Sequence, residues 1–285
     1  MKKRILLLTA TLAAVLTPLT GLAACKSDTS PTLWESDSQI SAILPDADAP
    51  TDSEISSDIS SVISSESTPE TPPVPQNAQY IRCTGDSVNL RSGAGTGYAV
   101  LGTAEKNTAY VVLGKSGGWY KTYYRGKVAY ISASYASVFT LEKADEQTED
   151  VLEQGYKLIG VPYVYGAVRL HDGKGNFLKG FTAQKFDCSS LVQYVFYQGA
   201  GKLLDVTTRT QVKQGTYVSR SKLQRGDCIY FTNEERQNKT GVERIGHVAI
   251  YLGNDYILHT ASDYARIEKM TAKRWSFYVE ARRFL

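Results

Sequence analysis

The chain has 285 residues, 42% of them hydrophobic, so it can bury ordinary cores and is not disordered throughout. That length allows one large domain or two smaller ones. The formal net charge of +3 hides a segregation, because residues 26–77 carry ten acidic residues and one basic residue, whereas residues 78–285 carry 28 basic and 19 acidic residues. A basic folded part suits an anionic partner, but the sequence has no Lys/Arg-rich run of the kind that binds nucleic acid, so we expect no nucleic-acid partner.

The N-terminus has the pattern of an export signal. Basic residues 2–4 precede an apolar segment, residues 5–22, which leads into Leu22-Ala23-Ala24-Cys25. An uncleaved transmembrane anchor is one interpretation, because the apolar segment approaches spanning length. Small residues before Cys25 favour a cleaved signal peptide. The segment resembles a bacterial lipoprotein signal, which implies removal of residues 1–24, a lipid on the Cys25 sulfur and a location on the outer face of the bacterial cell membrane. Plain secretion is the remaining alternative.

Residues 25–77 predict a solvated tether. They are rich in Ser, Thr, Asp, Glu and Pro, and they cannot bury enough apolar surface to offset the entropy of ordering. The tether is either a spacer between the membrane and the folded part or a linker of no selected length.

Three cysteines remain if Cys25 carries a lipid, and an odd number does not make a disulfide framework. Cys83 and Cys228 lie in apolar strand patterns, so we expect both in the core. At least one free thiol is left, and a reactive cysteine is therefore worth seeking.

Residues 78–140 predict a small all-β unit, because short β-favouring runs alternate with glycine-rich turns. The runs are 88–91, 109–113, 119–123 and 128–131. Together with the loop after Val88-Asn89-Leu90-Arg91, they resemble a bacterial SH3 domain. Ala94 and Ala129 stand where that family favours Pro and Gly. The resemblance implies binding of cell-wall peptides, without assigning any binding residue.

The sequence pattern changes from residue 145 onwards. Val151, Leu152 and Tyr156 have helical spacing, and Gly160-Val161-Pro162 should end that helix. The polar, glycine-rich residues 169–185 predict a loop or small hairpin inserted into the unit. We expect His171, within this insert, at the surface.

Cys188 should lie at the start of a helix. Leu191, Val192, Val195 and Phe196 form an apolar stripe, and Asp187 or Ser189 can cap the helix. A helix N-terminus stabilises a thiolate, which favours a reactive Cys188. A buried structural cysteine is the competing interpretation, because that is the commonest fate of a free cysteine.

Two of the three histidines follow Cys188 in a predicted hairpin. His247 and His259 lie in strand patterns joined by a turn at Gly253-Asn254-Asp255. Pairing residue 251 with 255 matches His247 with His259, so we expect the two rings on one face of the sheet. One ring could accept the Cys188 proton while the other orients it.

The motifs Asp187-Cys188-Ser189, Gly246–Gly253 and Ile257–Ser262 resemble the NlpC family of cell-wall cysteine peptidases. The resemblance covers residues 145–285 and implies a papain-like α+β fold, preceded here by the SH3-like barrel. The implied roles are nucleophile for Cys188, general base for His247, orienting residue for His259 and oxyanion contact for Tyr163, with Asp187 and Ser189 binding the substrate's amine and backbone. Ser190 replaces the family's usual Gly, and the 169–185 insert is longer than usual.

The resemblance further implies hydrolysis of the bond between γ-linked D-glutamate and a diamino acid in peptidoglycan stem peptides. We expect a monomer that needs no metal or organic cofactor. Three alternatives stay open: an amidase or acyl transferase on the same thiolate, a non-catalytic wall-binding lipoprotein, and a zinc hydrolase with Cys188, His247 and His259 as ligands. The zinc alternative lacks a closely spaced ligand pair of the HExxH or CxxC type.

Overall fold

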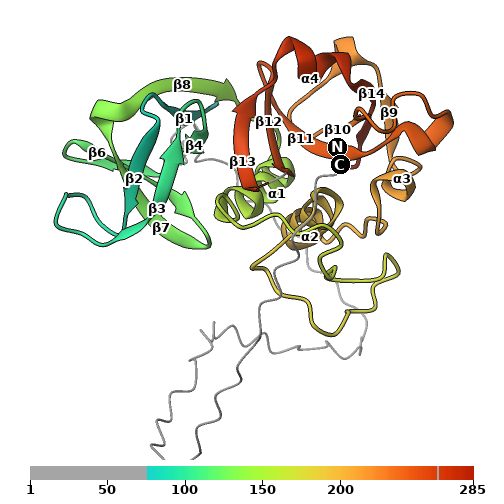
Figure 1. Cartoon of the computed structure of the whole chain (residues 1–285), viewed down its shortest axis with the longest axis horizontal. Helices are drawn as coiled ribbons and strands as arrows, with labels where there is room; N and C mark the ends of the chain where they lie inside the picture. The colour runs from blue at the N-terminus through green and yellow to red at the C-terminus, as the bar shows by residue number, and fades with distance from the viewer. Residues whose placement is uncertain (1–75, 262) are drawn as a thin grey trace, which may run out of the picture. The chain divides into compact units, whose positions relative to one another are not determined.

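The computed structural model describes residues 76–261 and 263–285 (Figure 1). The predicted signal peptide, the lipid attachment at Cys25 and almost all of the predicted tether lie outside the described residues. Among the helices of the described part, none is both long enough and apolar enough to cross a membrane.

The first described segment is all-β, as the sequence predicts. Its elements are β1 (Asn77–Cys83), β2 (Ser87–Arg91), β3 (Val100–Glu105), β4 (Ala109–Val111), β5 (Gly114–Ser116), β6 (Trp119–Tyr124), β7 (Lys127–Ser132), the 3-10 helix η1 (Ala133–Tyr135) and β8 (Ala136–Glu142). The order β3-β2-β7-β6-β5 forms an antiparallel sheet, while β1 pairs with β4 and β8. β1 begins at the last residue of the predicted tether, and Cys83 is buried in it as expected.

The second segment mixes helices and strands, which gives the α+β class (Figure 1). Its elements are α1 (Glu146–Lys157), α2 (Cys188–Ala200), α3 (Thr208–Gln211), β9 (Thr216–Val218), η2 (Arg220–Lys222), β10 (Cys228–Phe231), η3 (Gly241–Arg244), β11 (His247–Gly253), β12 (Tyr256–Ala261), β13 (Tyr264–Lys269), α4 (Ala272–Ser276) and β14 (Tyr278–Arg283). Asp145 caps α1, and Gly160 follows its end, as predicted. α2 packs against α1, β11 and β12, so its apolar stripe is fully buried.

One sheet runs through both segments. Its order is β8-β1-β4-β13-β12-β11-β10-β14-β9, and Ala109 of β4 pairs with Ile267 of β13 at the junction. Backbone hydrogen bonds therefore link the barrel strands directly to the strand that follows His259.

A buried cation ties the two segments together. The Arg225 side chain is 5% exposed, and its guanidinium donates to Glu149 at 2.6 and 3.0 Å, to the Tyr80 hydroxyl at 2.7 Å and to the Tyr156 hydroxyl at 2.8 Å. Tyr80 belongs to β1 and Tyr156 to α1. A buried guanidinium is stable when its donors are paired in this way. Arg225 thus joins the barrel to the helical layer.

A second junction precedes the predicted site. The Arg125 side chain donates to the Gly160 carbonyl at 2.7 Å. The Gly126 amide donates to the carbonyl of Lys157, the last residue of α1, and the Arg125 amide donates to the carbonyl of Ile159 just after it. Gly160 has φ of +87°, and a Cβ there would collide with the Tyr124 ring. The β6–β7 turn therefore fixes the chain just before it reaches Tyr163.

Candidate active site

Cys188 is the first residue of α2, as predicted. Asp187 caps the helix by accepting the Ser190 amide at 2.9 Å, while the Ser190 hydroxyl accepts the Asp187 amide at 2.9 Å. This reciprocal capping box explains how a serine is accommodated where the NlpC resemblance leads us to expect glycine. The helix N-terminus is thereby held in place around the sulfur.

The surroundings of the Cys188 sulfur affect its ionisation in opposite directions. Backbone amides of Val248, Ser189 and Cys188 itself point to the sulfur and favour the thiolate. Burial and the neighbouring Asp187 charge outweigh them and raise the pKa of Cys188 to about 12. Cys188 therefore rests as a neutral thiol, and the helix N-terminus alone does not create a standing thiolate. Helix α2, which begins at Cys188, also packs against β11, the strand that begins at His247.

The two strand histidines lie together, but not in the predicted register. Ile250 pairs with Leu258 and Tyr251 with Ile257, whereas the prediction paired residue 251 with 255. The predicted register was wrong by two residues, because the turn is the two-residue Asn254-Asp255 with a bulge beside it. A shift of two residues preserves the face of a strand.

His247 and His259 are therefore in direct contact. His247 Nε2 lies 2.9 Å from His259 Nδ1, and the ring planes are 80° apart. Burial, the His259 charge and Arg274 hold the pKa of His247 well below its usual value, and burial chiefly lowers the pKa of His259. Both rings are consequently neutral at pH 7, which is the form in which a histidine can accept a proton. The contact is compatible with the predicted roles of one ring as a base and the other as its orienting partner.

Tyr163 lies beside the chain segment that leads into Cys188, and its role as an oxyanion contact stays a prediction. Its backbone bridges Phe186, which precedes Asp187 and Cys188 in the chain. Burial, then the nearby Cys188 and Asp187 charges, raise the pKa of Tyr163 to about 12. The phenol is thus protonated and able to donate a hydrogen bond near the sulfur.

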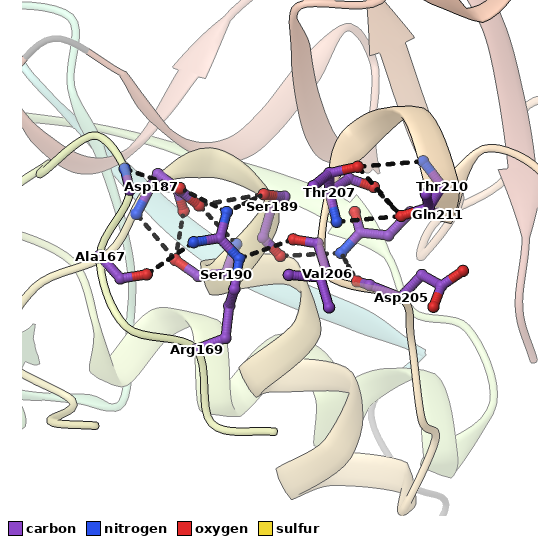
Figure 2. Close-up of polar contacts among 11 residues, drawn as sticks. Ala167, Arg169, Asp187, Ser189, Ser190, Asp205, Val206, Thr207, Thr210 and Gln211 are labelled. Carbon is purple, nitrogen blue, oxygen red and sulfur yellow. Dashed lines mark hydrogen bonds and ion pairs between the residues drawn. The ribbon is translucent and has the colours of Figure 1, made fainter. Parts of the chain in front are cut away.

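Asp187 and Ser189 belong to a closed polar network that includes a residue of the insert (Figure 2). Arg169 donates to Asp187 Oδ2 at 2.8 Å and to the Ser189 hydroxyl at 3.3 Å. Asp187 also accepts the Gly166 amide at 3.2 Å, the Ser189 hydroxyl at 3.1 Å and the Ser190 amide. The Asp187 side chain is 6% exposed and already forms an ion pair with Arg169. Its implied role in binding a substrate amine stays a prediction, and such binding would have to displace Arg169.

Arg169 also binds the segment that connects α2 to α3. Its remaining donors reach the Val206 carbonyl and the Ala167 carbonyl, each at 2.8 Å. Nearby, the Gln211 amide donates to the Ser189 and Asp205 carbonyls at 3.0 and 2.8 Å (Figure 2). The insert and the segment before α3 thus support the start of α2 from outside.

The insert is a small hairpin, as predicted, but His171 is not at the surface. His171 pairs with Phe177 across the hairpin, is fully buried and packs its ring 5.3 Å from that of Tyr197 in α2. The surface prediction was wrong because the insert folds back onto α2. Cys228 is buried in β10 as expected.

Two residues of the site were not found from the sequence. Arg169 lies in the insert, and Glu268 lies in β13 with a carboxylate oxygen 3.1 Å from His259 Nε2. Neither residue belongs to a recognisable motif. The sequence shows only that each is charged, and the structure shows that its segment folds against the site. Within the described residues, no group of three or more His, Cys, Asp or Glu side chains is arranged to hold a metal ion.

Comparison with known proteins agrees with this arrangement. The model of the NlpC/P60 family matches residues 160–283, and the model of the bacterial SH3 domain matches residues 86–137. The first match contains Cys188, His247 and His259, as well as Tyr163.

Three curated relatives are similar to part of this chain. The gamma-DL-glutamyl hydrolase of Bacillus subtilis is 34% identical over 52% of this chain and 32% of its own length. The murein DD-endopeptidase MepS/murein LD-carboxypeptidase of Escherichia coli is 38% identical over 38% of this chain and 54% of its own length. The gamma-D-glutamyl-L-lysine dipeptidyl-peptidase of Bacillus subtilis is 26% identical over 58% of this chain and 48% of its own length. The chain therefore spans between a third and about half of each relative. Residues 160–283 carry an NlpC/P60 domain, and residues 86–137 carry a bacterial SH3 domain.

Proposed function

We propose that this protein is a cysteine endopeptidase that hydrolyses peptide bonds in the stem peptides of peptidoglycan. The observation that carries the proposal is the contact between His247 and His259, 2.9 Å between ring nitrogens, on two strands that pack against α2, the helix that begins at Cys188. A nucleophile, a base and an orienting group in that order are the minimum that thiol-dependent amide hydrolysis requires.

In the first step His247 accepts the proton of the Cys188 thiol while the sulfur attacks the substrate carbonyl. Because the pKa of Cys188 is raised and that of His247 is lowered, this transfer is coupled to attack on the substrate carbonyl rather than completed beforehand. The sulfur forms a bond to the carbonyl carbon, and backbone amides at the start of α2 together with the Tyr163 hydroxyl stabilise the oxyanion. His247 returns the proton to the leaving amine as the amide bond breaks. Water then hydrolyses the thioester and restores the thiol.

We propose the bond between γ-linked D-glutamate and the diamino acid as the target. Support comes from the names of two relatives, a gamma-DL-glutamyl hydrolase and a gamma-D-glutamyl-L-lysine dipeptidyl-peptidase. The relative named as a DD-endopeptidase and LD-carboxypeptidase acts on other bonds of the same polymer, so the choice of bond needs its own measurement.

We also propose that the protein is anchored by a lipid on Cys25 at the outer face of the bacterial membrane. The support is the sequence Leu22-Ala23-Ala24-Cys25 after a basic and apolar N-terminus. Cys25→Ala should release the protein from membranes after a carbonate wash without loss of hydrolytic activity. A variant that stays in the washed membrane would point to an uncleaved apolar helix.

The chemistry is tested by two reagents applied to the full chain. Hydrolysis of a muropeptide mixture, followed by mass spectrometry, should survive EDTA and be lost after alkylation with iodoacetamide. Loss on chelation with recovery on adding Zn²⁺ would contradict the thiol mechanism and support the metal alternative.

A further inference from the structure

A carboxylate ends a line of polar side chains that begins at His247. His247 Nε2 contacts His259 Nδ1 at 2.9 Å, and His259 Nε2 lies 3.1 Å from Oε1 of Glu268. The geometry of this second contact is that of a close charge pair and not of a hydrogen bond, and no other partner reaches His259 Nε2 among the described residues. The same Glu268 oxygen lies 3.2 Å from a guanidinium nitrogen of Arg274 in α4.

The charges around Glu268 keep it ionised. Arg266 faces His259 across the β12–β13 pair, and Arg274 approaches from α4. Burial alone would raise the pKa of Glu268, but His259, Arg274 and Arg266 together lower it to about 2. Arg266 is itself paired with Asp263 at 2.9 Å and with Glu105 of β3 at 3.5 Å. At neutral pH Glu268 is therefore a carboxylate that can only accept hydrogen bonds.

An acceptor at this position determines where the protons of both rings lie. His259 is 1% exposed and neutral, so it carries a single N–H, and the carboxylate favours that N–H at Nε2. His259 Nδ1 then has a lone pair and accepts from His247. His247 must donate from Nε2, which leaves the lone pair of His247 on Nδ1. That atom is the one available for the Cys188 proton.

We propose that Glu268 is a positioning residue that fixes the tautomers of His259 and His247 and keeps a proton-accepting nitrogen available to Cys188. The proposal rests on the proposed function only in taking His247 as the base. Glu268 also favours the imidazolium that forms on His247 during attack, because its negative charge lies at the other end of the pair.

The test compares Glu268→Gln with Glu268→Asp in the full chain. The glutamine keeps the shape but can donate from its amide nitrogen to His259 Nε2, which permits the reversed tautomers. The aspartate keeps the charge on a shorter side chain. Glu280→Gln is the matched control, because Glu280 in β14 is also paired with an arginine, at 2.6 Å, and is 27% exposed against 30% for Glu268. Glu280 has no histidine partner among its described contacts.

The first readout needs no substrate. Nitrogen-15 spectra of the histidine side chains should show protonated Nε2 on both rings in the unmodified chain and in Glu280→Gln, and a changed tautomer pattern in Glu268→Gln. The second readout is hydrolysis of a γ-D-glutamyl–diamino acid peptide. Glu268→Gln should lower kcat about 10- to 100-fold with little change in KM, and Glu268→Asp should recover part of that loss.

The pH profile and a double variant separate positioning from a general structural role. Removing the negative charge lowers the pKa of both rings, so the acid limb of kcat/KM should move to lower pH in Glu268→Gln. In a His259→Asn background the same substitution should cost much less than in the unmodified chain, because the tautomer effect of Glu268 acts through His259 and only the direct effect of its charge remains. Unchanged tautomers together with an unchanged kcat in Glu268→Gln would overturn the proposal. If the unmodified chain cleaves no such peptide, the proposed function fails instead, and the spectra still decide the role of Glu268.

Discussion

His247 and His259 meet diagonally rather than directly across their strand pair. The observed pairs, Ile250 with Leu258 and Tyr251 with Ile257, would place residue 261 opposite His247 when continued along the strands. His259 is two positions away from that point, yet its Nδ1 lies 2.9 Å from His247 Nε2. Diagonal neighbours in a sheet are within reach of ring side chains. The contact therefore depends on ring orientation, which makes the partners of His259 important.

The hydrolytic activity of His259 variants should depend on whether the new side chain can accept a hydrogen bond from His247. His259→Asn and His259→Gln should keep measurable hydrolysis, because a side-chain amide oxygen can also accept the N–H of His247. His259→Ala should lose on the order of 10²-fold or more, as is typical of groups that position proton transfer. Initial rates with folding checked by circular dichroism provide the measurement. A folded and fully active His259→Ala would show that the orienting role belongs to another residue.

The rate of alkylation of Cys188 should depend on pH as expected for a buried thiol. Because the pKa of Cys188 is raised to about 12, the rate of reaction with iodoacetamide should be low at pH 7 and rise steadily into the alkaline range. Peptide mapping distinguishes Cys188 from Cys83 and Cys228. A fast rate that is constant between about pH 5 and pH 8 would reveal a standing thiolate and contradict this prediction.

Arg169→Met should destabilise the protein and make the thiol harder to ionise. The substitution leaves the Asp187 carboxylate buried without its cation, and breaking a buried pair in this way costs about 3–5 kcal/mol. The uncompensated charge also raises the pKa of Cys188, so alkylation at a fixed pH should slow. Urea unfolding and alkylation rates measure the two effects.

The control for Arg169 is Arg209→Met, because Arg209 pairs with Glu243 at 3.5 Å in a more exposed position. That variant should change the free energy of unfolding by less than about 1 kcal/mol. Adding Asp187→Asn to Arg169→Met should recover stability, since asparagine caps a helix without a charge. If the single Arg169 variant were as stable as the Arg209 variant, the network would not support α2.

Gly160→Ala should weaken the junction between the barrel and the catalytic segment. Its φ of +87° disfavours a side chain, and the added Cβ would collide with the Tyr124 ring. We expect a loss of at least about 1–3 kcal/mol in the free energy of unfolding, with reduced activity because Tyr163 follows closely. A thermal unfolding assay provides the measurement. Gly118→Ala, at a position with open space around it, should leave the free energy of unfolding unchanged in that assay.

The sequence predicted the elements and the reactive constellation because both depend on local patterns. The apolar stripe of α2 predicted its buried face. The sequence offered Asp187 or Ser189 as the cap, and the structure has Asp187 in that position. Alternation in the strands predicted that the two histidines share a face, although not their register, since a two-residue shift leaves the alternation unchanged. Turn geometry at Asn254 and Asp255 decided the register.

Contacts between distant segments could not be predicted. Arg169 reaches Asp187 only because the insert folds onto α2, and the same folding buries His171. The pairing of β4 with β13 likewise joins parts that the sequence presents as separate units. The raised pKa of Cys188 results from burial and a neighbouring charge, neither of which a helix N-terminus pattern reveals.

The most direct test of the central claim is mass spectrometry of the products from a synthetic L-Ala-γ-D-Glu-diamino acid peptide. The full chain should release L-Ala-D-Glu and the free diamino acid, and Cys188→Ala should release neither while remaining folded. An acyl-enzyme mass on Cys188 should appear when the reaction is quenched early. Cleavage at another bond by the full chain would contradict the proposed target, and equal turnover by Cys188→Ala would contradict the assignment of the nucleophile.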